Sequence, residues 1–265
     1  MLGIENFRNF ALQNMMQVEQ ILSEVYSGIT AGQTGFAMFD GGAHKAYHTL
    51  RMLDLPGCEK VHAVEADPFM AETFGKAIAP HSEKIKGRLA FHQAALQDDP
   101  KTKRIAWKSS PSHVGRSSIV SANAERDTIW GDNPDMEYRD AMTVPATTID
   151  QILENEQLPV PFIKTDLEGA DLIALKGAAA TLAKHRPVVA FENSLHSPKV
   201  HGFTIDEMIE YFADLGYVGM NFVGETLTKE NWFGFFEAWL VPTNHVEELR
   251  AHLHSSLAKR EVAFA

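Results

Sequence analysis

The sequence predicts an α/β fold in which short parallel strands alternate with helices. Short apolar runs such as residues 36–39 and 61–64 are typical of strands buried on both faces, and stretches with helical periodicity separate them. The composition is that of a globular protein, because 45% of the 265 residues are hydrophobic and 22% are charged. Such an alternation winds a mostly parallel sheet through right-handed crossovers, with helices covering it.

The predicted elements follow one another along the chain. The first is an amphipathic helix over residues 4–25, whose apolar positions recur at helical spacings and which ends at Ser27-Gly28. Strands are expected at 36–39, 61–64, 89–95, 161–165, 187–191, 217–222 and 234–240. Helices between them are expected to end near Leu53 and to span 68–78, 148–156, 170–183 and, from a capping box, 204–215. We expect the last strand to be an antiparallel partner at the edge of the sheet.

Three parts are expected along the chain. An N-terminal amphipathic helix takes residues 1–30, the main domain takes 31–245, and a C-terminal helix with a tail takes 246–265. Inside the main domain, residues from about 98 to 140 read as an irregular insertion, and connections of that length are usually functional or flexible. The apolar stripe of the first helix fits packing on its own domain or contact with a second subunit, so a homodimer is left open.

Charge and composition limit the partners and the compartment. The chain carries 24 Lys and Arg against 35 Asp and Glu, a net charge of −11, which would repel nucleic acid. No apolar run approaches the roughly 18 residues that a membrane span needs. With one cysteine, Cys58, and no signal-peptide pattern at the N-terminus, we expect a cytoplasmic protein.

Four predicted strands end in a carboxylate: Asp40, Glu65, Asp166 and Glu192. In an open α/β sheet the carboxyl ends of the strands share one edge, and ligands bind in the crevice there. Four acidic side chains at that edge make a negative mouth. This favours a ligand that is cationic or rich in hydroxyl donors.

The turn after the first strand is the sharpest local signal. Gly41 and Gly42 allow a tight turn and a close approach of the backbone to a ligand. Glu65 follows Asp40 at the end of the next strand, where a carboxylate accepts the hydroxyls of a ribose. The glycines that cradle a pyrophosphate are missing, which favours an adenosyl ligand with a positive sulfonium over a nicotinamide dinucleotide.

The strand end Lys164-Thr165-Asp166-Leu167-Glu168-Gly169 is the second signal. Carboxylates so close together can act as a base, an orienting group or a metal ligand. They can also be ordinary N-terminal charges of the following helix, which the helix dipole favours.

These segments together carry a family resemblance. FDGGAHKAYHT, VHAVEADP, VPATTIDQIL, FIKTDLEGADLIALKGA and VVAFEN resemble, in order and spacing, the FkbM family of S-adenosylmethionine-dependent O-methyltransferases, over residues 36–222. The resemblance implies a Rossmann-like class I methyltransferase fold with a mostly parallel seven-stranded sheet, helices on both faces and an antiparallel edge strand. The family's first motif is matched at Asp40, Gly42, Ala43 and Thr49, with His44 for its Asn and Ala46 for its Gly. Alanine suits that position if its φ is negative.

The resemblance also implies the cofactor site. Gly42 and Ala43 would line the methionine end of S-adenosylmethionine, and Asp40 would lie near its amino group. Glu65 would bind the ribose hydroxyls. The adenine would be flanked by Gln93 or Ala94, and the serines Ser117 and Ser118 are expected to close over the site.

Catalysis is expected at the second strand end. Asp166 would orient donor and acceptor, and so belongs to the cofactor site as well, while Glu168 or His196 would take the proton of the acceptor hydroxyl. His44 and Glu192 are further candidates for the base. With no His or Cys cluster at metal-ligand spacing, we expect no obligatory metal.

The leading hypothesis is methyl transfer to a hydroxyl of a saccharide or a small secondary metabolite. Trp107 and Trp130, in or near the insertion, could floor a sugar pocket, because aromatic faces suit carbohydrate. Two alternatives stay open: an NAD-dependent oxidoreductase, since Glu65 also suits that ribose, and a non-catalytic adenosyl- or sugar-binding module, which His44 and Ala46 would favour.

Overall fold

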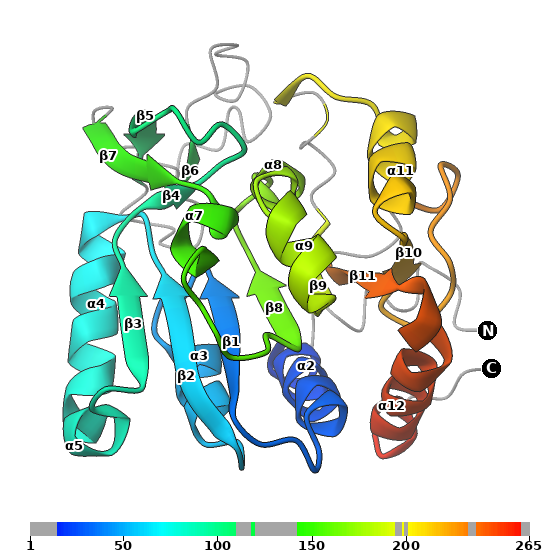
Figure 1. The fold of residues 1–265 in the computed structure, drawn as a ribbon, viewed down its shortest axis with the longest axis horizontal. Helices are drawn as coiled ribbons and strands as arrows, with labels where there is room; N and C mark the ends of the chain where they lie inside the picture. The colour runs from blue at the N-terminus through cyan, green and yellow to red at the C-terminus, as the bar shows by residue number, and fades with distance from the viewer. Residues whose placement is uncertain are drawn as a thin grey trace.

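The centre of the fold is a seven-stranded sheet, shown in a computed structural model that describes residues 15–109, 118–119, 142–193, 198, 201–232 and 237–260 (Figure 1). Its order is β10-β11-β9-β8-β1-β2-β3. The strands are β1 (Phe36–Gly41), β2 (Cys58–Val64), β3 (Leu89–His92), β8 (Phe162–Thr165), β9 (Val188–Glu192), β10 (Tyr217–Asn221) and β11 (Glu237–Pro242). Short apolar runs form these strands, as the pattern predicts, and all but the outer strand β3 are largely buried.

The sheet is mostly parallel, which confirms the predicted fold class. β1 pairs in parallel with β2 and β8, β2 with β3, and β8 with β9, while β11 runs antiparallel to both β9 and β10. The last strand, β11, is antiparallel as predicted, but its predicted place at the edge of the sheet is wrong. β10 forms the edge, and β11 lies between β10 and β9. Ala238, Trp239 and Leu240 of β11 are buried, so the more apolar strand takes the inner place.

Helices cover both faces of the sheet (Figure 1). Alternate strand residues face the two cores, so Met38 belongs to one apolar cluster and Ala37 and Phe39 to the other. The first core is closed by α2 (Met15–Ile29), α3 (Tyr47–Leu53), α5 (Ser82–Ile85) and α12 (Val246–Ala258). The second core is closed by α7 (Ile149–Leu153), α8 (Asp171–Lys176), α9 (Ala179–His185) and α11 (Ile205–Asp214). Near the outer strand β3, α4 (Pro68–Ile78) packs Phe74 against Ala63 of β2.

A second sheet lies beyond the carboxyl ends of β2 and β3 (Figure 1). Its order is β4-β7-β5-β6, with β4 (Ala95–Leu96), β5 (Arg104–Lys108), β6 (Ser118–Ile119) and β7 (Met142–Thr147). The expected strand over residues 89–95 is therefore two strands in two sheets, since β3 ends at His92. The described part of the insertion contributes β5 and β6 to this small sheet.

Two further differences concern the helices. The single helix expected over 170–183 is interrupted between α8 and α9, where a Cβ on Gly177 would lie 2.2 Å from the carbonyl oxygen of Gln97. The chain passes close to the β4 end at this point, which only glycine permits. The capping box at Thr204 and Glu207 is confirmed at the start of α11.

The N-terminal helix packs on its own domain over its described part. Val18, Ile21 and Val25 of α2 are buried in the first core, together with Leu249 and Leu253 of α12. Residues 4–14 of the predicted helix lie outside the described residues. Across the described ranges, every helix is too short or too polar to cross a bilayer.

Candidate functional site

The four predicted carboxylates meet at one edge of the sheet. Because β1, β2, β8 and β9 are parallel, their carboxyl ends lie together. Asp40 is the penultimate residue of β1, Glu192 ends β9, and Glu65 and Asp166 directly follow β2 and β8. The sequence therefore placed these four side chains at one edge of the sheet correctly.

Gly42 forms the tight turn after β1. Its φ is +76°, and a Cβ there would lie 2.0 Å from the carbonyl oxygen of Asp166. The same turn holds two non-glycine residues in left-handed conformation, His44 with φ +46° and Ala46 with φ +63°. The condition that Ala46 takes a negative φ is thus not met. Ala46 thus takes a conformation that glycine adopts freely, at the cost of steric strain in alanine.

Glu65 is fixed by backbone donors. Its Oε1 accepts from the Asp67 amide at 2.9 Å, and its Oε2 accepts from the His44 amide at 3.0 Å. Burial raises the pKa of Glu65 to about 7, against the lowering effect of these two bonds. Each oxygen keeps a second lone pair, so the carboxylate can still accept a ligand hydroxyl.

Asp40 is fully buried, and half of its carboxylate lacks a partner. Its Oδ2 accepts from the Thr49 hydroxyl at 2.5 Å, which gives the threonine of the motif a structural role. Its Oδ1 has no hydrogen-bond partner in the described chain. A buried carboxylate oxygen without a donor is costly, and a bound donor would remove that cost.

Lys164 supplies positive charge beneath this edge. It is buried on β8, in register with Asp40, and its Nζ lies 3.2 Å from Asp166 Oδ2. Burial alone would lower the pKa of Lys164, but the carboxylates of Asp166 and Asp40 outweigh burial and raise it. Lys164 therefore stays charged and holds the Asp166 carboxylate toward β8.

The turn after β8 is organised by Asp171, which the sequence did not single out. Its Oδ2 accepts from the Leu167 amide at 3.1 Å, and its Oδ1 accepts from the Glu192 amide at 3.3 Å. Glu168, inside that turn, has φ +51° and is followed by Gly169 at φ +92°. The buried Asp171 thus joins the ends of β8 and β9. A carboxylate at the first helical position was its only sequence signal.

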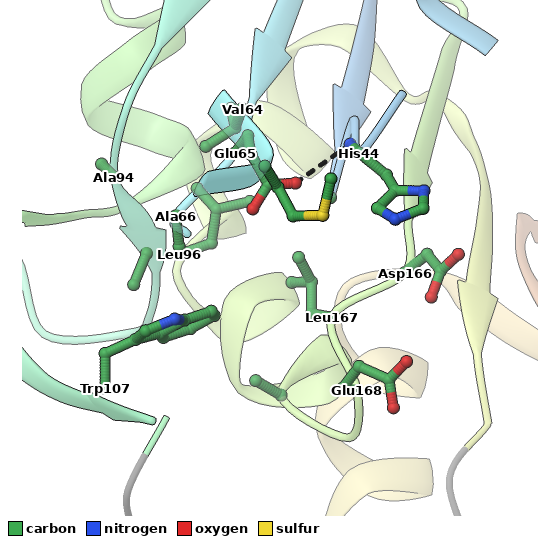
Figure 2. A pocket seen from close by; sticks show the side chains of 14 residues that line it. His44, Val64, Glu65, Ala66, Ala94, Leu96, Trp107, Asp166, Leu167 and Glu168 are labelled. Atoms are coloured by element: carbon green, nitrogen blue, oxygen red, sulfur yellow. Dashed lines mark hydrogen bonds between the residues drawn. The ribbon is translucent and has the colours of Figure 1, made fainter. Parts of the chain in front are cut away.

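A cavity opens between these turns (Figure 2). Its empty space, including the open solvent at its mouth, is about 720 Å³. Seven residues that the sequence singled out line it: Gly42, His44, Glu65, Ala94, Trp107, Asp166 and Glu168. Its other walls are Val64, Ala66, Met70, Ala95, Leu96, Leu167 and Ala170.

Other predicted site residues are not part of this lining. Asp40 and Ala43 are buried behind it, and Gln93 is exposed on the surface. His196, Ser117 and Trp130 lie outside the described residues, and of Ser118 only its place in β6 is described.

Glu192 and His44 differ in their surroundings. Burial and the charges of Glu168 and Asp166 raise the pKa of Glu192, whose buried Oε2 has no partner in the described chain. Burial and the charge of Lys45 lower the pKa of His44, so its imidazole is neutral near pH 7. No group of three or more His, Cys, Asp or Glu side chains within the described ranges is placed to hold a metal ion.

Comparison with known proteins identifies the family. The family model of the methyltransferase FkbM domain matches residues 40–218. A methyltransferase FkbM from Methylobacillus flagellatus is similar in structure over 88% of this chain and 60% of its own, at 14% identity and a TM-score of 0.46. The chain thus spans only 60% of the length of that protein. A search of curated proteins gives no match.

Two further solved structures are similar at lower TM-scores. The O-methyltransferase of Bacillus cereus, in complex with SAH, has 13% identity over 85% of this chain and 79% of its own, with a TM-score of 0.40. TomG of Streptomyces achromogenes, in complex with SAM, has 12% identity over 84% and 78%, with a TM-score of 0.41. Because these scores are below 0.5, the family assignment rests on the domain model, which covers most of the chain. The chain belongs to the methyltransferase FkbM domain family.

Proposed function

We propose that the protein is an S-adenosylmethionine-dependent O-methyltransferase acting on a hydroxyl of a saccharide or a small secondary metabolite. When bound, the cofactor supplies an electrophilic methyl group on a positive sulfonium. The family membership supports the reaction class. The observation that carries the cofactor is the arrangement of Asp40 and Glu65 at the ends of β1 and β2.

The residues present fit this cofactor. The partnerless Oδ1 of Asp40 suits an ammonium donor behind the Gly42 turn. Glu65 reaches the cavity with a free lone pair on each oxygen for ribose hydroxyls, and Ala66, Met70 and Ala94 offer an apolar wall for adenine. No cradle of glycine amides for a pyrophosphate faces this cavity in the described chain, so NAD is the weaker fit.

Asp166 and Glu168 are the residues that we assign to the reacting end. Figure 2 shows both on the side of the cavity near His44 and away from Trp107. Lys164 holds Asp166 in position to orient the acceptor, whose oxygen must lie roughly 3 Å from the methyl carbon in line with the bond that breaks. Glu168 or His196 then takes the proton of the hydroxyl.

The acceptor class rests on the charge at this edge. Asp166 and Glu168, which line the cavity, are carboxylates that accept hydrogen bonds from hydroxyl groups. A saccharide or polyhydroxylated metabolite presents several such donors.

Dimerisation through the N-terminal helix stays a prediction. Sedimentation velocity, which measures the oligomeric state, tests it directly.

The function is tested by incubating the protein with methyl-labelled S-adenosylmethionine and a panel of saccharides and hydroxylated metabolites. We expect one acceptor class to gain about 14 mass units plus the added mass of the isotope, because a labelled methyl group replaces a hydrogen atom. Label on a nitrogen acceptor alone would contradict O-methylation. Binding of S-adenosylhomocysteine with no labelled product across the panel would favour a non-catalytic module, and binding of NAD in its place would favour an oxidoreductase.

A further inference from the structure

Trp107 is the largest side chain in the cavity, and it comes from the small sheet rather than from the main one. It lies on β5, is only 7% exposed and lines the cavity with Glu65 and Ala94. In Figure 2 it lies across the cavity from Glu65, beside Leu96, and away from Asp166. An indole in that place borders the end of the cavity that is away from the proposed site of methyl transfer.

The indole is held by neighbours from several segments of the chain. Its Nε1 donates to Asp67 Oδ2 at 3.4 Å, and the Ser109 hydroxyl donates to the same oxygen at 2.6 Å. The ring also packs with Ala66, Ala95, Val144 and Ala170. A ring with a bonded edge and packed neighbours loses little freedom when a ligand stacks on it.

Asp67 couples this ring to the proposed ribose site. Its Oδ1 caps α4 by accepting from the Phe69 amide at 2.9 Å, and its own amide donates to Glu65 Oε1 at 2.9 Å. One buried aspartate therefore fixes the position of both Glu65 and Trp107. The two groups are placed to recognise adjacent parts of one ligand.

We infer that Trp107 stacks against the adenine of the bound cofactor. The inference rests on the proposed function, in which Glu65 holds the ribose. The base attached to that ribose then extends along the apolar wall of Ala66, Met70 and Leu96, where Trp107 is the aromatic side chain. Every base has a π-face, so an indole gains stacking energy from adenine without any particular hydrogen bond. The small sheet thereby contributes to cofactor binding.

The test is calorimetric titration of Trp107→Ala and Trp107→Phe with S-adenosylhomocysteine and with 5′-methylthioadenosine, in the absence of any acceptor. We expect Trp107→Ala to weaken both ligands about tenfold or more, and Trp107→Phe to stay within about threefold of the wild type. Trp232→Phe is the matched control, since Trp232 is buried in the second core outside the cavity and should leave both affinities unchanged. Binding of homocysteine, which has no adenine, should not depend on Trp107.

Fluorescence gives a second readout that does not depend on the alanine variant folding. Titration with S-adenosylhomocysteine should change the indole emission of the wild type and of Trp232→Phe, and this change should vanish in Trp107→Phe although the ligand still binds. If the wild type binds the ligand and Trp107→Ala binds it equally well, the inference is wrong while the proposed cofactor stands. If the wild type binds no adenosyl ligand, both the inference about Trp107 and the proposed cofactor are wrong. Loss of saccharide binding alone in Trp107→Ala would assign the ring to the acceptor and overturn the inference.

Discussion

The α-carbon of Gly42 approaches the backbone of Asp166 so closely that a Cβ would lie 2.0 Å from the Asp166 carbonyl oxygen. The turns after β1 and β8 thus touch through a residue that has no side chain, and the cavity is built around this contact. The two sequence motifs at these turns are therefore linked by one packing requirement, namely that position 42 carries no Cβ.

Gly42→Ala should therefore be strongly destabilising. The new methyl group would force the two turns apart and would impose left-handed strain at φ +76°, together about 2–5 kcal/mol of unfolding free energy. Gly75→Ala is the control, because Gly75 lies in α4 with nothing within 4 Å of the methyl group that alanine adds, and it should gain about 0.5–1 kcal/mol. Chemical denaturation measures both changes. Equal and small effects of the two substitutions would contradict the contact.

Ala46 gives a test of strain within the same loop. Replacing it by glycine relieves about 1–2 kcal/mol of left-handed strain but removes a buried methyl worth about 0.8 kcal/mol, so stability should stay level or rise slightly. Ala63→Gly removes a methyl from the same apolar cluster at an ordinary strand position and should cost about 1–2 kcal/mol. If Ala46→Gly lowers the unfolding free energy as much as Ala63→Gly does, the loop is not strained.

The main sheet could be predicted from the sequence because its strands are short apolar runs that end at carboxylates. The small sheet could not, because β4 and β6 have two residues each and carry no periodicity. β4 pairs with β7, which is remote in the chain. The inner position of β11 likewise depends on which strand β9 pairs with, and no local pattern encodes that choice.

The candidate site likewise contains residues that the sequence predicts and residues that it does not. Gly42, Glu65, Asp166 and Glu168 are visible in the sequence because each lies in a motif beside its strand. Asp67 and Trp107 are not visible as a pair, since 40 residues separate them and only folding brings them together. Asp171 could not be predicted for another reason. Its partners are the backbone amides of Leu167 and Glu192, and a backbone amide gives no side-chain pattern in the sequence.

The affinity for S-adenosylhomocysteine should depend on pH through Glu65. Burial raises its pKa to about 7, so below pH 7 the carboxyl holds a proton and accepts ribose hydroxyls poorly, and above pH 7 it is ionised. Between about pH 8 and pH 6 the dissociation constant should increase about tenfold. Titration calorimetry at both pH values measures this dissociation constant. Glu65→Gln should bind more weakly and lose this dependence, whereas exposed Glu83→Gln should keep it. A dependence unchanged in Glu65→Gln would assign the titration to another group.

The base role of Glu168 predicts a specific kinetic effect. At saturating cofactor, Glu168→Gln should lower kcat by about 10²–10⁴, because the amide cannot accept the hydroxyl proton. The dissociation constant of S-adenosylhomocysteine should change by less than about threefold, since the side chain volume is kept. Steady-state kinetics on the identified acceptor gives both values. Turnover close to that of the wild type would remove Glu168 from this role and leave His196 as the remaining candidate of the two.

The central claim is that the carboxyl edge of β1 and β2 binds an adenosyl sulfonium cofactor, and titration calorimetry with S-adenosylhomocysteine on the wild type and Asp40→Asn tests it most directly. The wild type should bind one equivalent. Asp40→Asn keeps the shape of the side chain and an oxygen for the Thr49 hydroxyl but loses the negative charge that we propose binds the ammonium group of the cofactor, so it should bind at least about tenfold more weakly. A wild type that takes up no S-adenosylhomocysteine, or an Asp40→Asn variant of equal affinity and stability, would contradict the account.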